Sequence, residues 1–455
     1  MSDKSGKLSL AVKMGFGAGD LGGNLFFTAM GFWSLFYLTD IVGIPAAAAG
    51  FAILIGKIWD AVTDPLMGFV SDRTKTRFGR RRPYLLFGSL PLFACMWWFF
   101  SAPEFSTPTG GVLWVVLVLC LLNTAYTVVN IPYGSLTPEL TQDYTERNSL
   151  NGFRFSFAVV GTILGAAIVL PIVSLAGGNT RLGFSYVGFV FGLVMALSML
   201  TTFLAVREQD RSCEAPLTER FFETFVHVFR NGMYVRLLIV YACNLTGITF
   251  VQSILVYYFK YLYHNEEMTT IAMICLLVTA MVCIPLSVVI AKITGKKRLY
   301  QLALGIISLG CIAIFLFGHI LGMYYTLGVM IFAGIGIGLS YVPPFSMLPD
   351  VIEVDAVRTS QRKEGAYYGM WTFVSKIGIA LAPALVGVVL AISGFIPDKT
   401  QSPETLLAIR ILIGPIPLAI FIAAILVIER YPLDEKSYLR IISKVEINNE
   451  AESSR

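Results

Sequence analysis

The sequence predicts an all-α membrane protein in which two six-helix halves surround a central cavity. Of the 455 residues, 56% are hydrophobic and only 14% are charged, whereas soluble globular proteins average about 25% charged residues. The apolar residues form continuous runs that lack the alternation of a transmembrane β-strand. A polar stretch at residues 207–231 divides these runs into two groups of equal number.

Each apolar run is close to the ~20 residues that a helix needs to cross a bilayer. We expect about twelve spans, at residues 12–38, 46–70, 84–102, 111–135, 153–175, 184–206, 235–262, 269–293, 299–319, 322–346, 367–393 and 406–429. The expected domains are an N-terminal half (1–206), a cytoplasmic linker (207–232), a C-terminal half (233–430) and a cytoplasmic tail (431–455).

Lysine and arginine are concentrated in alternate loops, such as residues 73–82, 207–230 and 296–298. Cytoplasmic loops carry this excess, so both termini are expected in the cytoplasm of a multi-pass protein in the plasma membrane, the inner membrane of a bacterium. The net charge of +5 then reflects topology rather than nucleic-acid binding. The expected partners are the lipid bilayer, a small-molecule substrate and a coupling cation, with a functional monomer and no nucleic acid.

The expected span at 46–70 contains three ionisable residues, Lys57, Asp60 and Asp64. Each costs about 2.5–3.5 kcal/mol at the centre of a membrane helix. Asp60 and Asp64 share one helix face, and two carboxylates ~6 Å apart repel by roughly 3 kcal/mol at an effective dielectric constant near 20. A proton, a metal cation or Lys57 would relieve this repulsion, so we predict a site for Na⁺ or H⁺ and no other cofactor. A static bridge between lysine and aspartate is the alternative.

The end of the expected fourth span offers neutral oxygen atoms. Thr127 and Asn130 lie three residues apart, and Pro132 removes the backbone hydrogen bond to the carbonyl of Val128. These groups could complete a sodium shell or bind substrate hydroxyls. Pro132 could equally produce a packing kink.

Three further charges are predicted to face the cavity. Asp20 lies about one-third into the first span among small residues, Arg154 lies near the start of the fifth, and Lys376 lies in the middle of the eleventh. Asp20 could instead form a purely structural pair with Arg154 or Lys376, and Arg154 could extend to the membrane surface.

Two regions could form gates on the predicted cytoplasmic side. Asp72 could accept from an arginine of the following loop, such as Arg80, although simple anchoring by positive charge is the alternative. Asp350 and Glu353 precede a basic run at residues 358–363, which could equally be a solvated loop. The seven cysteines and three histidines show no catalytic or metal-binding spacing, so no enzyme is expected.

Several of these motifs together resemble the glycoside–pentoside–hexuronide:cation symporters, a family with the major facilitator fold. They are Asp20, residues 57–65, residues 77–83, residues 130–133 and Arg154. The resemblance implies that Asp60 and Asp64 bind Na⁺ or H⁺, with help from Thr127. It also implies that Asp20 and Arg154 hold substrate hydroxyls, with Lys376 near the shared site. From the residues themselves we add Asn130 to both sites, Tyr133 to the substrate site, and a role in charge coupling for Lys57 and Lys376.

The sequence departs from the melibiose-transporting branch of that family at two positions. That branch has an aspartate in place of Asn130 and a tryptophan in place of Gly134. Residues 59–69, residues 347–352, Lys376 and residues 431–435 also resemble the branch of sodium-dependent lysophosphatidylcholine symporters. The expected function is therefore cation-coupled import of a sugar or glycoside. Import of an amphiphilic lipid, a channel, and a non-transporting receptor or scaffold are the alternatives.

Overall fold

The structure is a computed structural model that describes residues 8–140, 144–207, 228–359, 364–433 and 437. The greater part of the expected linker and tail therefore lies outside the described residues. The described part is helical and contains no β-strand. Its helices are α1 (Leu10–Phe36), η1 (Tyr37–Ile41), α2 (Ala46–Arg73), α3 (Arg82–Phe99), α4 (Pro108–Ser135), α5 (Thr137–Leu140), α6 (Tyr144–Ala167), α7 (Val169–Ser174), α8 (Thr180–Ala205), α10 (Gly232–Tyr257), η2 (Tyr258–Leu262), α11 (Glu267–Thr294), α12 (Lys296–Ala313), η3 (Ile314–Gly318), α13 (His319–Thr359), α14 (Glu364–Ile392), α15 (Pro403–Ile413) and α16 (Pro415–Glu429).

Ten helical stretches of the described chain are long and apolar enough to cross a membrane. One of them, Lys296–Asp355, is long enough to cover two of the expected spans. Gly322 interrupts its helical backbone with a φ of 81°, at the point where the two expected spans meet. Helix α3 coincides with a further expected span. The predicted class of an all-helical, multi-span protein is confirmed, while the count of twelve stays a prediction.

The chain forms two compact units. The first comprises residues 1–214, 252–274 and 383–409, and the second comprises residues 215–251, 275–382 and 410–455. Two segments from beyond the expected linker thus belong to the first unit. The division into two six-helix halves remains a prediction.

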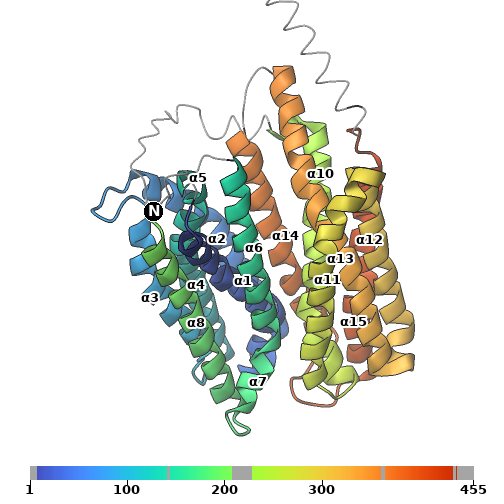
Figure 1. The fold of residues 1–455 in the computed structure, drawn as a ribbon. Coiled ribbons are helices and arrows are strands. Elements are labelled where there is room, and N and C mark those ends of the chain that lie inside the picture. The colour runs from blue at the N-terminus through green and yellow to red at the C-terminus, as the bar shows by residue number, and fades with distance from the viewer. Residues whose placement is uncertain (1–7, 141–143, 208–227, 360–363, 434–436, 438–455) are drawn as a thin grey trace, which may run out of the picture. The chain divides into compact units, whose positions relative to one another are not determined.

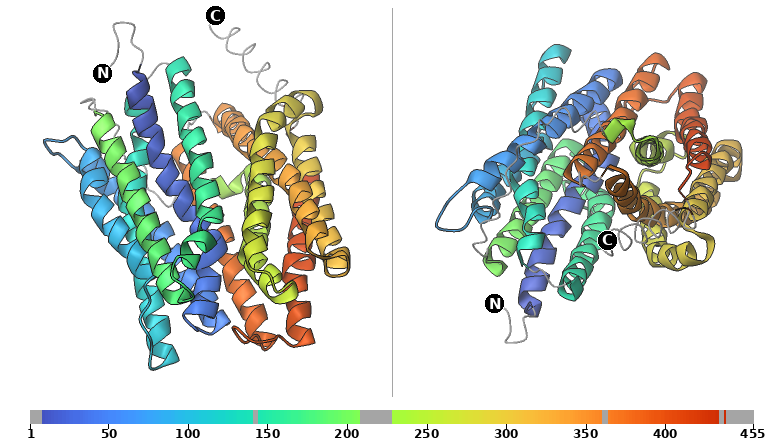
Figure 2. Two further views of the ribbon diagram at one scale, coloured as in Figure 1. Left: turned by 60° about the horizontal axis from the view of Figure 1, so that its bottom comes forward. Right: turned by 90° about the horizontal axis from the view of Figure 1, so that it is seen from above.

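Close contact between helices organises the first unit. Helix α1 packs against α6 and α8, α3 packs against α4 and α8, and α2 packs against α4; α1 and α6 lie side by side in both views of Figure 2. A Cβ atom at Gly161 would lie 2.2 Å from the carbonyl oxygen of Leu21, and one at Gly165 would lie 2.7 Å from that of Leu25. Glycine therefore allows α6 to touch the backbone of α1, as is common between membrane helices.

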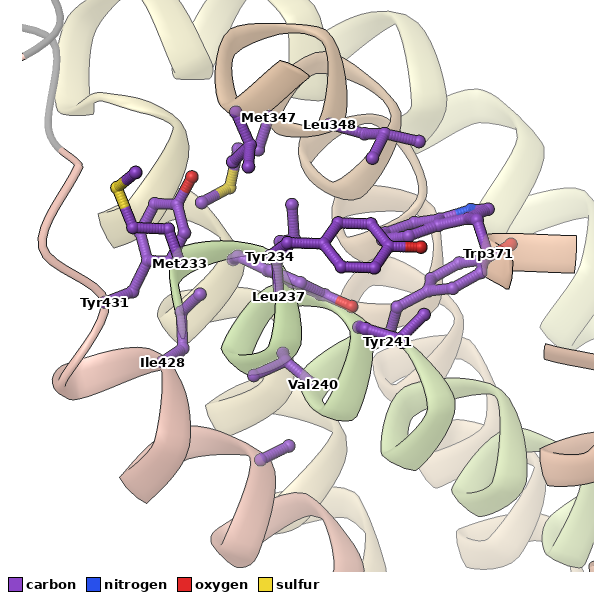
Figure 3. Packing of buried hydrophobic residues seen from close by; sticks show 14 of the residues in the cluster. Met233, Tyr234, Leu237, Val240, Tyr241, Met347, Leu348, Trp371, Ile428 and Tyr431 are labelled. Atoms are coloured by element: carbon purple, nitrogen blue, oxygen red, sulfur yellow. The ribbon is translucent and has the colours of Figure 1, made fainter. Parts of the chain in front are cut away.

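In the second unit, α12 packs against α13 and α16 (Figure 1). Figure 3 shows the aromatic side chains at the centre of its apolar core. Tyr241 of α10 stacks on Trp371 of α14, with ring centroids 4.2 Å apart, and the Tyr234 hydroxyl donates to the carbonyl of Tyr367 at 2.7 Å. The core thus ties α10 to α14 inside this unit.

Candidate functional site

The two predicted carboxylates of α2 meet a hydroxyl of α4. The Oγ1 atom of Thr127 lies 2.8 Å from Oδ1 of Asp60 and 2.9 Å from Oδ1 of Asp64. Asp60 and Thr127 are almost completely buried, with 2% and 1% exposure. Three of the predicted cation-site residues are therefore brought together, and they can form a compact set of oxygen ligands.

The number of protons in this contact is informative. A threonine hydroxyl carries one hydrogen, so it can donate to only one of the two carboxylates at a time. The hydroxyl oxygen is similarly close to the second carboxylate, and that contact is attractive only if the carboxyl group carries a proton or a cation lies beside it. The geometry is therefore suited to one additional positive charge, supplied by either H⁺ or a metal ion.

Lys57 lies in a polar and aromatic environment. Its Nζ atom is 3.4 Å from Oδ1 of Asn123. The same atom is 5.5 Å from the ring centroid of Phe26 and 5.4 Å from that of Phe27. Both rings are within the range of a cation–π interaction. Sequence reasoning missed Asn123, although it precedes Thr127 by four residues and so lies one turn away on the same face of α4.

A second cluster surrounds Asp20 on α1. Arg154 of α6 approaches Asp20 with Nε 2.5 Å from Oδ2 and Nη2 3.2 Å from Oδ1. The Tyr133 hydroxyl of α4 lies 2.7 Å from Oδ2 of Asp20 and 2.8 Å from the carbonyl of Phe16. Arg154 also donates to Thr137 Oγ1 at 3.1 Å. The two contacts between the Arg154 guanidinium and the Asp20 carboxylate form the two-pronged geometry that makes arginine–carboxylate pairs strong.

The Asp20–Arg154 pair is not sealed, because the two side chains remain 18% and 25% exposed. The buried Tyr126 ring of α4 stacks on Phe26 of α1, with centroids 4.4 Å apart. Phe26 is also one of the two rings close to Nζ of Lys57, so an aromatic pair adjoins the lysine of α2.

Two further predicted residues are Asn130 and Lys376. Asn130 is half-buried on α4, and its side-chain amide has no hydrogen-bond partner among the described residues. Lys376 is half-buried on α14, in the second unit. Their predicted roles remain untested by these contacts.

The predicted gates are only partly described. The side chains of Asp72 and of residues 358–359, and the whole of residues 360–363, lie outside what the structure describes. Arg80 is half-buried and Glu353 is exposed. Asp350 pairs with Lys296, its Oδ2 atom 2.6 Å from Nζ. The two residues are 54 positions apart in the chain, so no local sequence pattern connects them.

Among the described residues, no group of three or more histidine, cysteine, aspartate or glutamate side chains is placed to hold a metal ion. The acid pair provides two carboxylates and needs neutral oxygens such as that of Thr127. Carboxylate and other oxygen ligands suit hard cations, so these atoms can supply part of the coordination shell of such an ion.

Comparison with known proteins gives relatives over nearly the whole chain. The symporter sll1374 of Synechocystis sp. is 30% identical over 526 residues, covering 94% of this chain and 95% of the relative. The putative sulfoquinovose importer of Salmonella typhimurium is 30% identical, covering 96% and 93%. The sodium-dependent lysophosphatidylcholine symporter 1-A of Danio rerio is 26% identical, covering 90% and 83%.

The fold is that of solved transporters. A bacterial homologue of the lysosomal transporter Spinster, in an inward-facing conformation, superimposes with a TM-score of 0.67 at 14% identity, covering 95% of this chain and 97% of that one. The family described as MFS/sugar transport protein matches residues 15–435. Because this match takes in nearly the whole sequence, the chain belongs to the MFS/sugar transport protein family, whose members are membrane transporters.

Proposed function

We propose that this transporter is a cation-coupled symporter that imports a sugar or a glycoside by alternating access. The observation that carries the proposal is the shared hydroxyl of Thr127, which joins Asp60 and Asp64 in a buried position. An acid pair of this kind inside a membrane is expensive to maintain without a function. A transporter can use it to bind a cation on one side and release it on the other.

The cation changes the charge of the site. The two carboxylates carry two negative charges, and a bound monovalent cation lowers this negative charge by one. A ligand shifts a conformational equilibrium only through different affinities for the two states. The acid pair provides such a difference if the two states hold the carboxylates at different separations. Both Na⁺ and H⁺ fit the donor set.

The Asp20 cluster supplies the groups that a sugar needs. A carboxylate accepts hydrogen bonds from sugar hydroxyls, whereas a guanidinium and a phenol hydroxyl can donate to them. Arg154 and Tyr133 both donate hydrogen bonds to Asp20. A substrate hydroxyl that binds here would replace one of these hydrogen bonds. The amide of Asn130 adds both a donor and an acceptor nearby on α4. The sulfoquinovose importer among the relatives supports a monosaccharide or glycoside as the substrate class.

A lysophospholipid is the second candidate, because the lysophosphatidylcholine symporter matches 90% of this chain. In either case we place both termini in the cytoplasm and the protein in a bacterial inner membrane as a functional monomer. The inner membrane symporter YicJ of Escherichia coli, which is 29% identical over 94% of this chain, supports the membrane assignment.

Reconstituted proteoliposomes test the proposal. Labelled sulfoquinovose and labelled lysophosphatidylcholine are offered in turn, under an imposed gradient of Na⁺ or of H⁺. We expect accumulation of one of them against its own gradient, and its loss in Asp60→Asn and Asp64→Asn. Glu104→Gln is the control, because Glu104 is exposed and only loosely paired with Arg181, at 3.6 Å. Accumulation that persists in both aspartate variants would contradict the acid pair as the coupling site.

A further inference from the structure

An ion cluster with a buried carboxylate at its centre lies in the first unit, apart from the acid pair, and involves two π-helical turns. Asp40 is on η1 with a completely buried side chain, and Lys260 is on η2. The Lys260 Nζ atom is 3.0 Å from Oδ1 of Asp40 and 2.7 Å from Oδ1 of Asp398. We call these three residues, together with Tyr261, the Asp40 cluster. Single π-helical turns within longer helices are frequent at functional positions.

Hydroxyl groups complete the surroundings of Asp40. Tyr261 donates to its Oδ1 atom, and Thr39 lies 2.8 Å from its Oδ2 atom. The Thr39 hydroxyl is also 2.6 Å from that of Tyr257. Burying a charge is costly unless it is paired and hydrogen-bonded, and both conditions hold here.

A small-residue seam, defined by Ala46, Gly50, Pro383 and Gly387, lies in the same unit. A Cβ atom at Gly50 would lie 2.6 Å from the carbonyl oxygen of Pro383, and one at Gly387 would lie 2.1 Å from that of Ala46. The first turns of α2 and the last turns of α14 therefore touch backbone to backbone. Small residues at a helix contact allow backbones to approach this closely.

The cluster and the seam join segments that are remote in the chain. Asp40 and Ala46 precede the polar linker expected at residues 207–232, whereas Lys260, Pro383 and Asp398 follow it. In an alternating-access transporter these two parts of the chain must separate at one end at a time. The loops next to the cluster are the ones poor in lysine and arginine, expected on the outer side.

We propose that the Asp40 cluster and the α2–α14 seam form the outer closure of the substrate path, made and broken once in each transport cycle. This inference rests on the proposed function. An ion pair suits a reversible closure. The desolvation cost of burying its two charges approaches the attraction gained, so opening exchanges the pair for hydration and the two states stay close in free energy. A wholly apolar contact would favour the closed state more strongly.

A zinc bridge tests the closure. In the double variant Asp40→His/Lys260→His, two imidazoles replace side chains whose ends meet at 3.0 Å, and imidazoles bind Zn²⁺ well. We expect Zn²⁺ to abolish uptake in the double variant and EDTA to restore it. Neither single variant should respond to Zn²⁺. A double variant that shows a Zn²⁺-dependent rise in melting temperature and still transports at its metal-free rate would overturn the proposal.

A second variant covers the case in which the histidines prevent folding. Asp40→Asn/Lys260→Met removes both charges and keeps the approximate size. We expect slower uptake at an unchanged cation requirement, and slower hydrogen exchange in residues 37–41 and 258–262, because an uncharged contact favours the closed state. Glu104→Gln is again the control at the same end. Unchanged uptake and unchanged exchange in the neutral pair would contradict a closing role.

The two proposals fail in different ways. If the wild-type protein transports neither probe, the proposed function fails, but the closure can still be read by hydrogen exchange in the histidine double variant. Zn²⁺ should then slow exchange in η1 and η2. If transport depends on Asp60 and Asp64 but Zn²⁺ binds without inhibiting it, only the closure fails.

Discussion

The hydroxyl of Thr127 is shared by Asp60 and Asp64, so its replacement tests the cation site with a small change. Thr127→Ala removes one hydrogen-bonding group, worth about 0.5–1.5 kcal/mol. We expect the cation concentration for half-maximal uptake to rise about twofold to tenfold, with substrate affinity at saturating cation unchanged. Thr127→Ser keeps the hydroxyl and is the matched control. A serine variant as impaired as the alanine variant would point to lost packing instead.

Glu266 lies between η2 and α11, close to the Asp40 cluster. Burial raises the pKa of its carboxyl group above the ordinary value of 4.5; Lys260 opposes the rise, while Asp40 and Asp398 add to it. A raised pKa means that the folded state binds the proton more tightly than the unfolded state. The stabilisation is therefore complete below pH 4.5 and is lost as the pH rises through the folded-state pKa.

Glu266→Gln should remove this dependence. We expect the variant and the wild type to melt at similar temperatures below pH 4.5, and the variant to become the more stable protein as the pH rises. Melting curves of the purified protein in detergent measure the difference between the two. A wild-type protein that gains stability relative to the variant with rising pH would show that the attraction of Lys260 prevails.

Residues with a charge inside an apolar run could be predicted from the sequence. The structure joins Asp60 with Asp64 and Thr127, and Asp20 with Arg154 and Tyr133. The Asp40 cluster could not be found in the same way. Asp40 lies just past an expected span and Lys260 close to the end of another, where charges ordinarily face water. Only the long-range contact shows that Asp40 is buried.

At the scale of helices, the contact between α1 and α6 depends on glycine. A Cβ atom at Gly161 would be 2.2 Å from the backbone oxygen of Leu21, so Gly161→Ala must push the helices apart. Overpacking of this kind costs about 1–3 kcal/mol, and we expect a lower melting temperature.

Gly152 provides a control on the same helix. A Cβ atom there would meet nothing within 4 Å, and alanine is the better helix former by about 0.8–1.0 kcal/mol. Gly152→Ala should therefore be neutral or stabilising in the same melting experiment. If Gly161→Ala were equally harmless, the α1–α6 contact would have to be more adaptable than its backbone spacing indicates.

Hydropathy located the helices well and their interruptions less well. The expected boundary between the spans at 299–319 and 322–346 falls next to the break at Gly322. The expected span at 406–429 is instead divided into α15 and α16 at Gly414. A Cβ atom at Gly414 would be 2.6 Å from that of Phe315. The position needs glycine because of a neighbour that hydropathy along the chain does not reveal.

At the scale of the whole molecule, the sequence predicted the class of fold but not the membership of the compact units. Residues 252–274 and 383–409 belong with the first unit, where Lys260 and Asp398 meet Asp40. Hydropathy registers that a segment is apolar, and it contains no information about which distant segment it contacts. The sequence pattern therefore does not predict which charged residues, remote in the chain, form an ion pair.

The orientation in the membrane follows from charge and can be measured without knowledge of the substrate. Lysine and arginine cluster at residues 73–82 and 296–298, whereas residues 263–267 and 396–402 contain few. Cytoplasmic loops retain positive charge, so a fluorescent-protein fusion after residue 455 should fluoresce, and an alkaline phosphatase fusion after residue 398 should be active. Phosphatase activity at residue 455 would place the C-terminus outside. In that case the Asp40 cluster would lie at the cytoplasmic end, and the closure proposed for the outer side would belong to the inner one.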